Sequence, residues 1–411
     1  MSRRRRTRAP GPADALAIDR GGRFAAALGD FDDFGETTSS YEGVPVAVSG
    51  GIRGERVVVE VVRKYSDRLA CRVVEVLTPD IDRVAAPCPY VGECTGCQFQ
   101  HIAYERQLEI KRDRVTRALE RSNLARPVDV RHTVPSPVLL GYRNHARFTI
   151  GRTGEVGFVN RHTRRFLRVG ECLLMAPVIN GVLAGVQGRL AGMTQMSVRA
   201  GLRTGDLIVQ PVLPIGVSGS EHGSSHYTES VAGRIFRIAG SSFFQVNVAV
   251  AELVVELVED ALRLTGRERV VDAYAGVGVF TALLASQARE VIGIEDSASA
   301  VADARSNAAG LANVRFEQGR TEAVLATLSG VDAVVLDPPR AGCHPTTISA
   351  LRAMDPSPAS IAMVSCEPDA MARDLALLCE GGRYLVDWVQ PVDMFPQTYH
   401  VECVAAIRQA S

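Results

Sequence analysis

The sequence predicts an α/β protein whose C-terminal part is a doubly wound sheet, preceded by a small β-barrel and a central α+β domain. Apolar strand-like runs alternate with helical segments after residue 243, which is typical of a doubly wound sheet. Before residue 80, short β-rich runs are separated by glycines, as in a small barrel. Between them, a helical pattern over residues 104–121 precedes alternating segments that favour an antiparallel sheet.

The domain organisation follows from these changes in pattern. A chain of 411 residues with 46% hydrophobic composition can bury more than one core. We expect a disordered basic tail, a barrel, a central domain and an α/β domain, at residues 1–12, 13–80, 81–232 and 233–411. The N-terminus leads into no apolar stretch and no run of about 18 apolar residues occurs, so we expect no membrane contact and a cytoplasmic location.

Charge is distributed unevenly along the chain. The formal net charge is zero, but residues 1–170 hold 29 Lys and Arg against 20 Asp and Glu, whereas residues 171–411 hold 17 against 26. The first part therefore carries +9 and the second −9. A basic front half predicts that this part of the chain binds a polyanion.

The pattern of short strands in the predicted barrel is typical of oligonucleotide-binding barrels. Its candidate strands are Phe24–Leu28, Val44–Val48, Glu55–Val62 and Arg68–Leu77. Turn residues separate these runs, as a barrel of short strands requires. Four basic residues in this region are candidates for contacts with nucleic-acid phosphates, namely Arg53, Arg56, Arg63 and Lys64.

A glycine-rich turn marks the candidate cofactor site. The segment Arg269–Phe280, RVVDAYAGVGVF, is an apolar strand that runs into Gly276 and Gly278 and then a helix. Glu295 ends the next strand, where an acidic side chain can accept hydrogen bonds from ribose hydroxyls. Thr281 stands where the dinucleotide fingerprint has its third glycine, which disfavours NAD. The turn by itself fits a purely structural role equally well.

Three further segments follow or connect predicted strands at the expected carboxyl edge of the sheet. They contain Asp337, Cys366 and Glu402. The segments are VLDPPRAG (335–342), VSCEPDAMARDL (364–375) and DMFPQTYHVE (393–402). A thiol, a base and an orienting carboxylate are what substitution at C5 of a pyrimidine requires, because this carbon becomes nucleophilic only after a thiolate adds to C6. Taken singly, each residue fits a structural role; together they favour this chemistry.

These segments resemble the RNA uracil-C5 methyltransferase family, in which a DPPR turn, an S-C-x-P loop and a D-x-F-P-x-T-x-H-V-E motif follow one another. The resemblance implies a Rossmann-like methyltransferase domain that uses S-adenosylmethionine. It assigns Cys366 as the nucleophile, Glu402 as the base that removes the C5 proton, and Asp337 as a residue that orients the uracil and faces the sulfonium. Glu367 departs from the Asn that many relatives have after the cysteine.

The same resemblance assigns the cofactor pocket. SSFFQVN (241–247) is similar to a family segment whose glutamine contacts the cofactor. The implied cofactor residues are Gln245, Tyr274, Gly276, Gly278, Glu295 and Asp337. Arg320 stands where methyltransferases often place an acid near the adenine, so adenine recognition stays unassigned.

Four cysteines have the spacing of a metal site. Cys88, Cys94 and Cys97 form a C-x5-C-x2-C pattern, and Cys172 follows 75 residues later. Four thiolates fit Zn or an iron-sulfur cluster, and spacing alone does not separate these two. The three-plus-one arrangement resembles the 4Fe-4S site of the family, which makes a 4Fe-4S cluster the expectation and Zn the alternative.

The expected substrate is RNA. Residues 13–80 resemble the TRAM barrel of RNA-modifying enzymes, and the barrel together with the cysteine motif resembles the branch that acts on large-subunit (23S) rRNA. A tRNA T-loop uridine is the alternative, and an inactive RNA-binding or assembly protein is the second alternative. Because a target uridine in a folded RNA must be turned out, Phe244 and Phe395 are candidate stacking partners. A monomer is the expected state.

Overall fold

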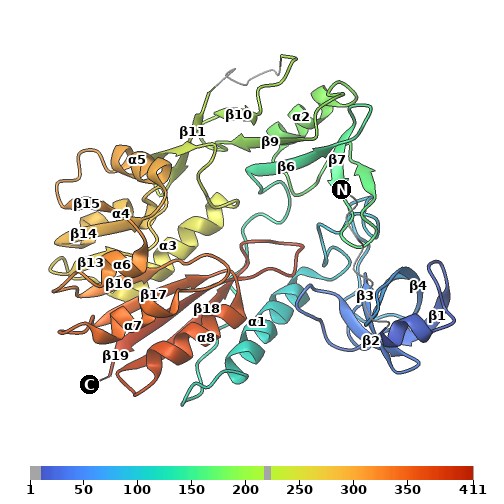
Figure 1. Ribbon diagram of the computed structural model, residues 1–411, viewed down its shortest axis with the longest axis horizontal. Coiled ribbons are helices and arrows are strands. Elements are labelled where there is room, and N and C mark those ends of the chain that lie inside the picture. Colours follow the sequence, from blue (N-terminus) through green and yellow to red (C-terminus); the bar gives the residue numbers. More distant parts are fainter. Residues whose placement is uncertain (1–10, 217–223, 411) are drawn as a thin grey trace, which may run out of the picture. The chain divides into compact units, whose positions relative to one another are not determined.

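The computed structural model describes residues 11–216 and 224–410, which form two compact units (Figure 1). The first unit comprises the chain up to Gln107, together with residues 157–169 and 397–399. The second comprises residues 108–156, 170–396 and 400–411. Of the predicted basic tail, residues 1–12, only the last two lie within the described residues. The predicted domain ranges stay predictions.

The first unit contains a five-stranded sheet in the order β1-β4-β5-β3-β2. Its strands are β1 (Arg23–Ala27), β2 (Thr37–Tyr41), β3 (Val44–Ser49), β4 (Arg56–Lys64) and β5 (Leu69–Thr78). Val57, Val59 and Val61 of β4 are buried and alternate with more exposed residues, so one face of the strand covers the core. A short 3-10 helix, Pro12–Ala15, precedes β1. This strand-rich region agrees with the predicted barrel.

A short antiparallel hairpin, β7 (Val156–Val159) and β8 (Phe166–Arg168), gives most of its residues to the first unit. Gly157 pairs with Arg168 and Val159 with Phe166, so residues 160–165 form the tip. A β-carbon on Gly157 would lie 1.9 Å from the Leu167 carbonyl oxygen, which explains the glycine.

The central part of the second unit is antiparallel, as the alternating sequence predicted. β9 (Gln195–Ala200) pairs with β6 (His145–Ile150) and with β10 (Leu207–Gln210). Helix α2 (Pro177–Val186) belongs to this part. A separate hairpin is formed by β11 (His226–Val231) and β12 (Arg234–Ala239).

A seven-stranded sheet forms the rest of the second unit, in the order β15-β14-β13-β16-β17-β19-β18 (Figure 1). Its strands are β13 (Arg269–Asp272), β14 (Glu290–Glu295), β15 (Val314–Gln318), β16 (Ala333–Leu336), β17 (Ser360–Ser365), β18 (Tyr384–Val392) and β19 (Glu402–Gln409). The first five in the order are parallel, and β19 runs antiparallel to both β17 and β18.

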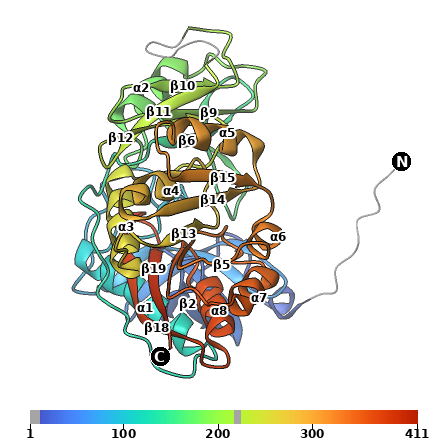
Figure 2. The same ribbon diagram turned by 90° about the vertical axis from the view of Figure 1, so that its left-hand side faces the viewer.

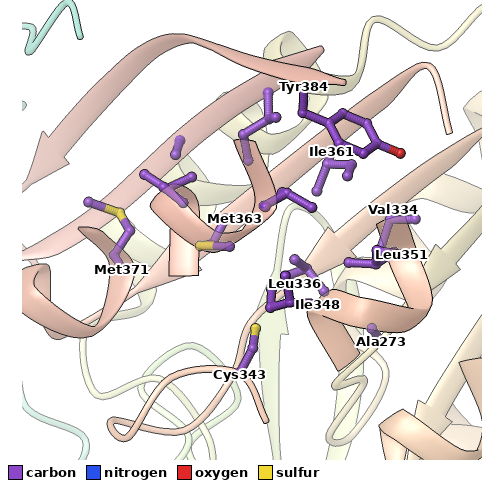
Figure 3. Close-up of a cluster of buried hydrophobic side chains, with 14 of the residues drawn as sticks. Ala273, Val334, Leu336, Cys343, Ile348, Leu351, Ile361, Met363, Met371 and Tyr384 are labelled. Carbon is purple, nitrogen blue, oxygen red and sulfur yellow. The ribbon is translucent and has the colours of Figure 1, made fainter. Parts of the chain in front are cut away.

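Helices cover both faces of this sheet, which confirms the doubly wound fold. One core packs α3 (Val248–Leu262) and α4 (Val279–Leu284) on the sheet, and the other packs α6 (Thr321–Leu325), α7 (Pro345–Ala353) and α8 (Pro368–Cys379). Figure 2 shows α3 on one side of β19 and α7 and α8 on the other, and Figure 3 shows Met363 and Met371 in the second core. Helix α5 (Ala298–Asn307) packs near β15, and α1 (Tyr104–Glu120) contributes to the second core.

The strand order reverses beside β13, because β14 lies on one side of it and β16 on the other. Open α/β sheets bind ligands at the carboxyl ends of strands next to such a reversal. The residues that follow β13, β14, β16 and β17 are therefore placed together. In the described part of the chain, no helix is long and apolar enough to cross a membrane.

Candidate active site

The turn after β13 needs both of its glycines, for different reasons. Gly276 and Gly278 have positive φ values of +53° and +85°, a region that favours glycine. A β-carbon on Gly278 would lie 3.1 Å from the Phe316 ring and 3.2 Å from the Ala304 β-carbon, whereas one on Gly276 would meet open space. Gly278 therefore packs the turn against α5, and Gly276 leaves room above it.

Glu295, at the end of β14, is bonded to this turn. Its Oε2 accepts a hydrogen bond from the Gly276 backbone N–H at 2.9 Å, and its Oε1 accepts one from the Ser297 N–H at 2.7 Å. A carboxylate offers about four acceptor positions, so two remain for a ligand. The side chain is half-buried, as the predicted contact with ribose hydroxyls requires.

Thr281, which replaces the third glycine of the dinucleotide fingerprint, binds a buried carboxyl group instead. Its N–H and its hydroxyl donate to Oδ2 of Asp272 at 3.0 and 2.6 Å. Burial raises the pKa of Asp272 to about 6, although the bonds from Thr281 lower it. The sequence reasoning missed Asp272; a carboxylate at the end of an otherwise apolar strand was the available signal.

Asp337 follows β16, beside the strand that ends in Asp272. It is half-buried, and burial together with the nearby Asp272 carboxylate raises its pKa to about 7. The predicted cofactor residue Tyr274 lies between these strands and α7, with its hydroxyl 3.5 Å from Thr347 Oγ1, and burial raises its pKa. Several carboxyl groups thus meet at the carboxyl edge of the sheet.

Cys366 and Glu402 are brought together by the register of two antiparallel strands. Ser365, the last residue of β17, pairs with Cys403 of β19, so Cys366 directly follows this pair in one segment and Glu402 directly precedes it in the other. The Glu402 carboxyl group is also close enough to raise the pKa of the Cys366 thiol. The predicted nucleophile and the predicted base are therefore neighbours, although 36 positions separate them in the chain.

Both side chains have a raised pKa. Glu402 is only 3% exposed, and burial, with the nearby Asp337 carboxylate, raises its pKa well above the ordinary value. Burial also raises the pKa of the Cys366 thiol to about 11; Glu402 raises it further, and the Arg340 guanidinium opposes the shift. The thiol of this chain is therefore protonated at neutral pH.

Glu367, which replaces the expected Asn, holds two arginines beside the thiol. Its Oε1 accepts a hydrogen bond from Arg114 of α1 at 2.6 Å, and its Oε2 accepts one from Arg340 at 3.2 Å. Arg340 belongs to the turn that also carries Asp337. The replacement therefore ties α1 and this turn to the residue that follows Cys366.

The connection that leads to Glu402 is fixed by buried polar contacts. Lys111 of α1 and Asp393 are both fully buried and form an ion pair, and Lys111 Nζ also donates to the Phe395 carbonyl at 3.1 Å. Tyr142 donates its hydroxyl hydrogen to the Pro396 carbonyl at 3.1 Å. The sequence reasoning missed Lys111, because nothing near it in the chain signals the partner.

Gln245 lies two residues before Asn247, the N-cap of α3. Its backbone carbonyl accepts a hydrogen bond from Asn144 Nδ2 at 3.0 Å, and its side chain is half-buried. Among the described residues, the side-chain amide of Gln245 has no hydrogen-bond partner. The contact with Asn144 thus fixes its backbone and leaves the amide available.

The expectation for Phe244 was wrong. Phe244 is 6% exposed and packs edge-on against Tyr227 in a hydrophobic core, so it cannot stack on a base. Its neighbour Phe243 is 71% exposed, and this could not be read from two adjacent phenylalanines. Phe395 is half-buried, with its ring 5.9 Å from that of His400, whose pKa burial and nearby cations lower to about 4.

The four predicted metal ligands are half-buried. Cys88, Cys94 and Cys97 lie in the first unit and Cys172 in the second. Within residues 11–216 and 224–410, no group of three or more His, Cys, Asp or Glu side chains is arranged to hold a metal ion. The four thiols have the donor chemistry that Zn or an iron-sulfur cluster requires, so the metal site stays a prediction and no chemical step is derived through it.

Known proteins resemble this chain over most of its length. The family model described as tRNA (Uracil-5-)-methyltransferase matches residues 226–409. A Synechocystis protein named as an uncharacterized RNA methyltransferase is 32% identical, over 91% of this chain and 93% of its own. A Listeria monocytogenes protein with the same description is 31% identical, over 95% and 98%.

A solved structure has the same fold. The Pyrococcus abyssi tRNA (uracil-54, C5)-methyltransferase, in complex with S-adenosyl-L-homocysteine, aligns with a TM-score of 0.71. The alignment covers 93% of this chain and 99% of that one, at 24% sequence identity. At this identity the likeness establishes the fold.

Proposed function

The chain belongs to the RNA uracil-C5 methyltransferase family, and from this premise we propose that it methylates C5 of a specific uridine in RNA with S-adenosylmethionine as the methyl donor. The observation that supports the proposal is the last pair of the β17–β19 register, Ser365 with Cys403, which has Cys366 and Glu402 as its immediate neighbours. A thiol can add to C6 of the pyrimidine as the nucleophile, and a nearby buried carboxyl group can remove the C5 proton afterwards.

In the proposed mechanism, the Cys366 thiol first releases its proton to water. The thiolate then adds to C6 of the uracil, and C5 gains the electron pair of the former C5–C6 double bond. S-adenosylmethionine, when bound, supplies the electrophilic methyl group. Glu402 then removes the C5 proton, and the C6–S bond breaks as the double bond re-forms and the thiolate leaves. The raised pKa of Glu402 makes it a stronger base than an exposed glutamate.

We propose that the donor lies at the carboxyl edge of the sheet, held by Gln245, Tyr274, Gly276, Gly278, Glu295 and Asp337. Two observations support this position. The space above Gly276 is open, and Glu295 has acceptor positions left beside it. Half-buried Asp337 offers a negative charge close to a cationic sulfonium.

The RNA itself is proposed to be large-subunit (23S) rRNA, because the barrel and the cysteine motif occur together in this chain as they do in that branch of the family. A tRNA T-loop uridine is the second candidate, favoured by the fold of the Pyrococcus abyssi enzyme. A catalytically inactive RNA-binding or assembly protein is a third reading, which the reaction assay tests directly.

Several other expectations stay predictions. We propose residues 13–80 as a TRAM-like RNA-binding domain, residues 81–232 as a central iron-sulfur domain, and residues 233–411 as the methyltransferase domain. The 4Fe-4S cluster, with Zn as its alternative, rests on the resemblance of the cysteine arrangement to the site of the family. The cytoplasmic location and the monomeric state rest on sequence composition and on the expected substrate.

The test is methyl transfer from labelled S-adenosylmethionine to unmodified rRNA and unmodified tRNA, followed by nucleoside analysis. We expect label in 5-methyluridine of one RNA, and none with Cys366→Ala. Cys379→Ala is the matched control, because it removes a half-buried thiol at the far end of α8. Label in neither RNA, or label retained by Cys366→Ala, would reject the proposed mechanism.

A further inference from the structure

The tip of the β7–β8 hairpin, together with strand β8, carries a concentration of positive charge. Residues 160–168, NRHTRRFLR, contain four arginines and no acidic residue. Arg164, Arg165 and Arg168 are exposed, and Phe166 between them is 37% exposed. Of the four arginines, only Arg161 forms an ion pair within the described part of the chain, with Glu36 at 2.7 Å. Three cationic side chains therefore face solvent without a carboxylate partner.

The tip is anchored from its buried side by His162. This residue is 7% exposed, and its Nε2 lies 2.7 Å from Oε1 of Glu36, which is also buried. Its Nδ1 lies 3.3 Å from the Tyr65 hydroxyl, and its carbonyl accepts a hydrogen bond from Arg63 at 2.6 Å. Both ring nitrogens and the backbone carbonyl of His162 thus contact residues from the 36–65 part of the first unit.

The backbone of the tip is fixed as well. Asn160 Oδ1 accepts hydrogen bonds from the N–H groups of His162 and Thr163 at 2.9 and 2.8 Å. Its Nδ2 donates to the Glu93 carbonyl at 2.7 Å. Arg164 has a φ of +58°, an uncommon conformation for a residue with a side chain, and such conformations persist where their surroundings hold them. The exposed side chains are therefore presented on a rigid loop, which lowers the entropic cost of binding.

Further cations adjoin the anchor. The guanidinium carbons of Arg63 and Arg68 each lie 4.7 Å from the centroid of the Tyr65 ring, and this ring is bonded to His162. Arg68 also pairs with Asp67 at 3.2 Å, which leaves the net charge of the group positive. Arg63 of β4 and Arg68, which precedes β5, thus lie beside the residue that anchors the hairpin.

We propose that this group, which we name the hairpin surface (Arg63, Arg68, Arg164, Arg165, Phe166 and Arg168), binds the phosphate backbone of the substrate RNA. The inference rests on the proposed function for the identity of the polyanion. Arg164, Arg165 and Arg168, which have no acidic partners among the described residues, suit phosphates. The exposed Phe166 ring offers a face on which an unpaired base stacks. Backbone contacts of this kind position an RNA and carry no sequence information.

The test compares two triple variants with equal loss of charge. The tip variant, Arg164→Ala/Arg165→Ala/Arg168→Ala, removes the three exposed arginines of the hairpin. The control variant, Arg267→Ala/Arg289→Ala/Arg408→Ala, removes three exposed arginines of the second unit. Binding of end-labelled, unmodified 23S rRNA and tRNA is measured over a range of salt concentrations, without S-adenosylmethionine. We expect Kd to rise at least tenfold for the tip variant, with a salt slope lower by about 0.7 for each lost phosphate contact. The control variant should match wild type.

Phe166→Ala separates stacking from charge. It should weaken binding at least about fivefold and leave the salt slope unchanged, because stacking releases no counterions. In methylation assays the tip variant should raise KM for RNA and keep kcat at saturating RNA. A tip variant that binds RNA as wild type does, or that loses kcat alone, overturns the proposal.

The two proposals fail in distinguishable ways. Because binding is read without methyl transfer, a chain that methylates neither RNA and still loses binding in the tip variant contradicts the proposed function alone. Full methylation together with unchanged binding in the tip variant contradicts the hairpin surface alone. Circular dichroism of each variant excludes loss of folding as the cause of weaker binding.

Discussion

At the scale of single residues, Cys366 stands in a surrounding that opposes its ionisation. Its thiol is partly buried and faces the Glu402 and Asp337 carboxyl groups, with Arg340 as the opposing cation. Reactive cysteines usually have a lowered pKa, whereas the pKa of Cys366 is raised to about 11. The reactive thiolate is therefore a small fraction of the thiol at neutral pH. The chemistry must therefore depend on pH.

The first prediction concerns that dependence. Since only the thiolate attacks C6, and since its fraction rises with pH below the pKa, the single-turnover rate should rise about tenfold per pH unit above neutral pH. Below pH 7 the rise should be steeper, because Asp337, whose pKa is about 7, must also ionise. Rapid-quench methylation across pH measures this. RNA affinity, measured in parallel, should change little, and a flat rate profile would contradict the assignment of Cys366.

The second prediction concerns Glu402→Gln. The amide cannot accept the C5 proton, so turnover should fall by about 100- to 10,000-fold. Addition of Cys366 and methyl transfer should still occur, because neither step needs this base. A covalent protein–RNA adduct should therefore accumulate and survive denaturing electrophoresis.

Two variants serve as controls for that adduct. Cys366→Ala/Glu402→Gln should form none, since the adduct is a bond to the thiol. Glu380→Gln, which changes an exposed acid at the end of α8, should turn over as wild type does. Normal release by Glu402→Gln would show that another group removes the proton.

At the scale of elements, the connection between β18 and β19 is held by a lysine from a distant helix. The chain has two lysines among its 46 basic residues, and Lys111 lies fully buried against Asp393. Burial lowers the pKa of Lys111, and Asp393 opposes that shift. Oδ2 of Asp393 has no hydrogen-bond partner among the described residues, so this carboxylate depends on Lys111.

The third prediction is that Lys111→Met destabilises the fold by about 3–5 kcal/mol, because it leaves a buried carboxylate without its partner. Urea unfolding measures the loss. Lys64→Met is the matched control, since the ion pair of Lys64 with Asp19 is partly exposed, and such a pair contributes about 0–1 kcal/mol. Lys111→Met/Asp393→Asn should recover part of the loss. Equal losses for both lysines would contradict the role given to the buried pair.

How far the sequence predicts these elements depends on the distance between interacting residues. The doubly wound sheet was predictable, because apolar strands and helices signal themselves locally. Cys366 and Glu402 were named from motifs, but their proximity depends on a strand register that no local pattern contains. The Lys111–Asp393 pair and the His162–Glu36 pair join residues 282 and 126 positions apart, so only the folded chain shows them. Phe243 and Phe244 are adjacent residues of the same type, so the sequence does not show that the first is exposed and the second is buried.

At the scale of the whole molecule, charge and cysteines divide between the two units. The hairpin surface and three of the predicted cluster ligands lie in the first unit, whereas Cys366 and Glu402 lie in the second. RNA binding and chemistry are therefore separable by mutation. This is why KM and kcat are expected to respond to different variants.

The fourth prediction concerns the cysteines. Protein purified without oxygen should contain about four iron and four sulfide per chain if a 4Fe-4S cluster is bound. Cys97→Ser should lose the iron, and Cys379→Ser should keep it. Zinc at about one atom per chain would favour the alternative site instead. Absence of both metals from the wild-type protein would contradict either reading.

The position of β19 has a consequence for how the protein is made. This strand lies between β17 and β18 in space, yet both precede it in the chain, so translation leaves a gap in the sheet until residues 402–409 emerge. Until then β17 and β18 each keep an unpaired edge, and such edges invite aggregation. The same strand delivers Glu402, so every shorter nascent chain lacks the proposed base. The order of synthesis thus delays the appearance of the proposed base until the last strand of the sheet is available.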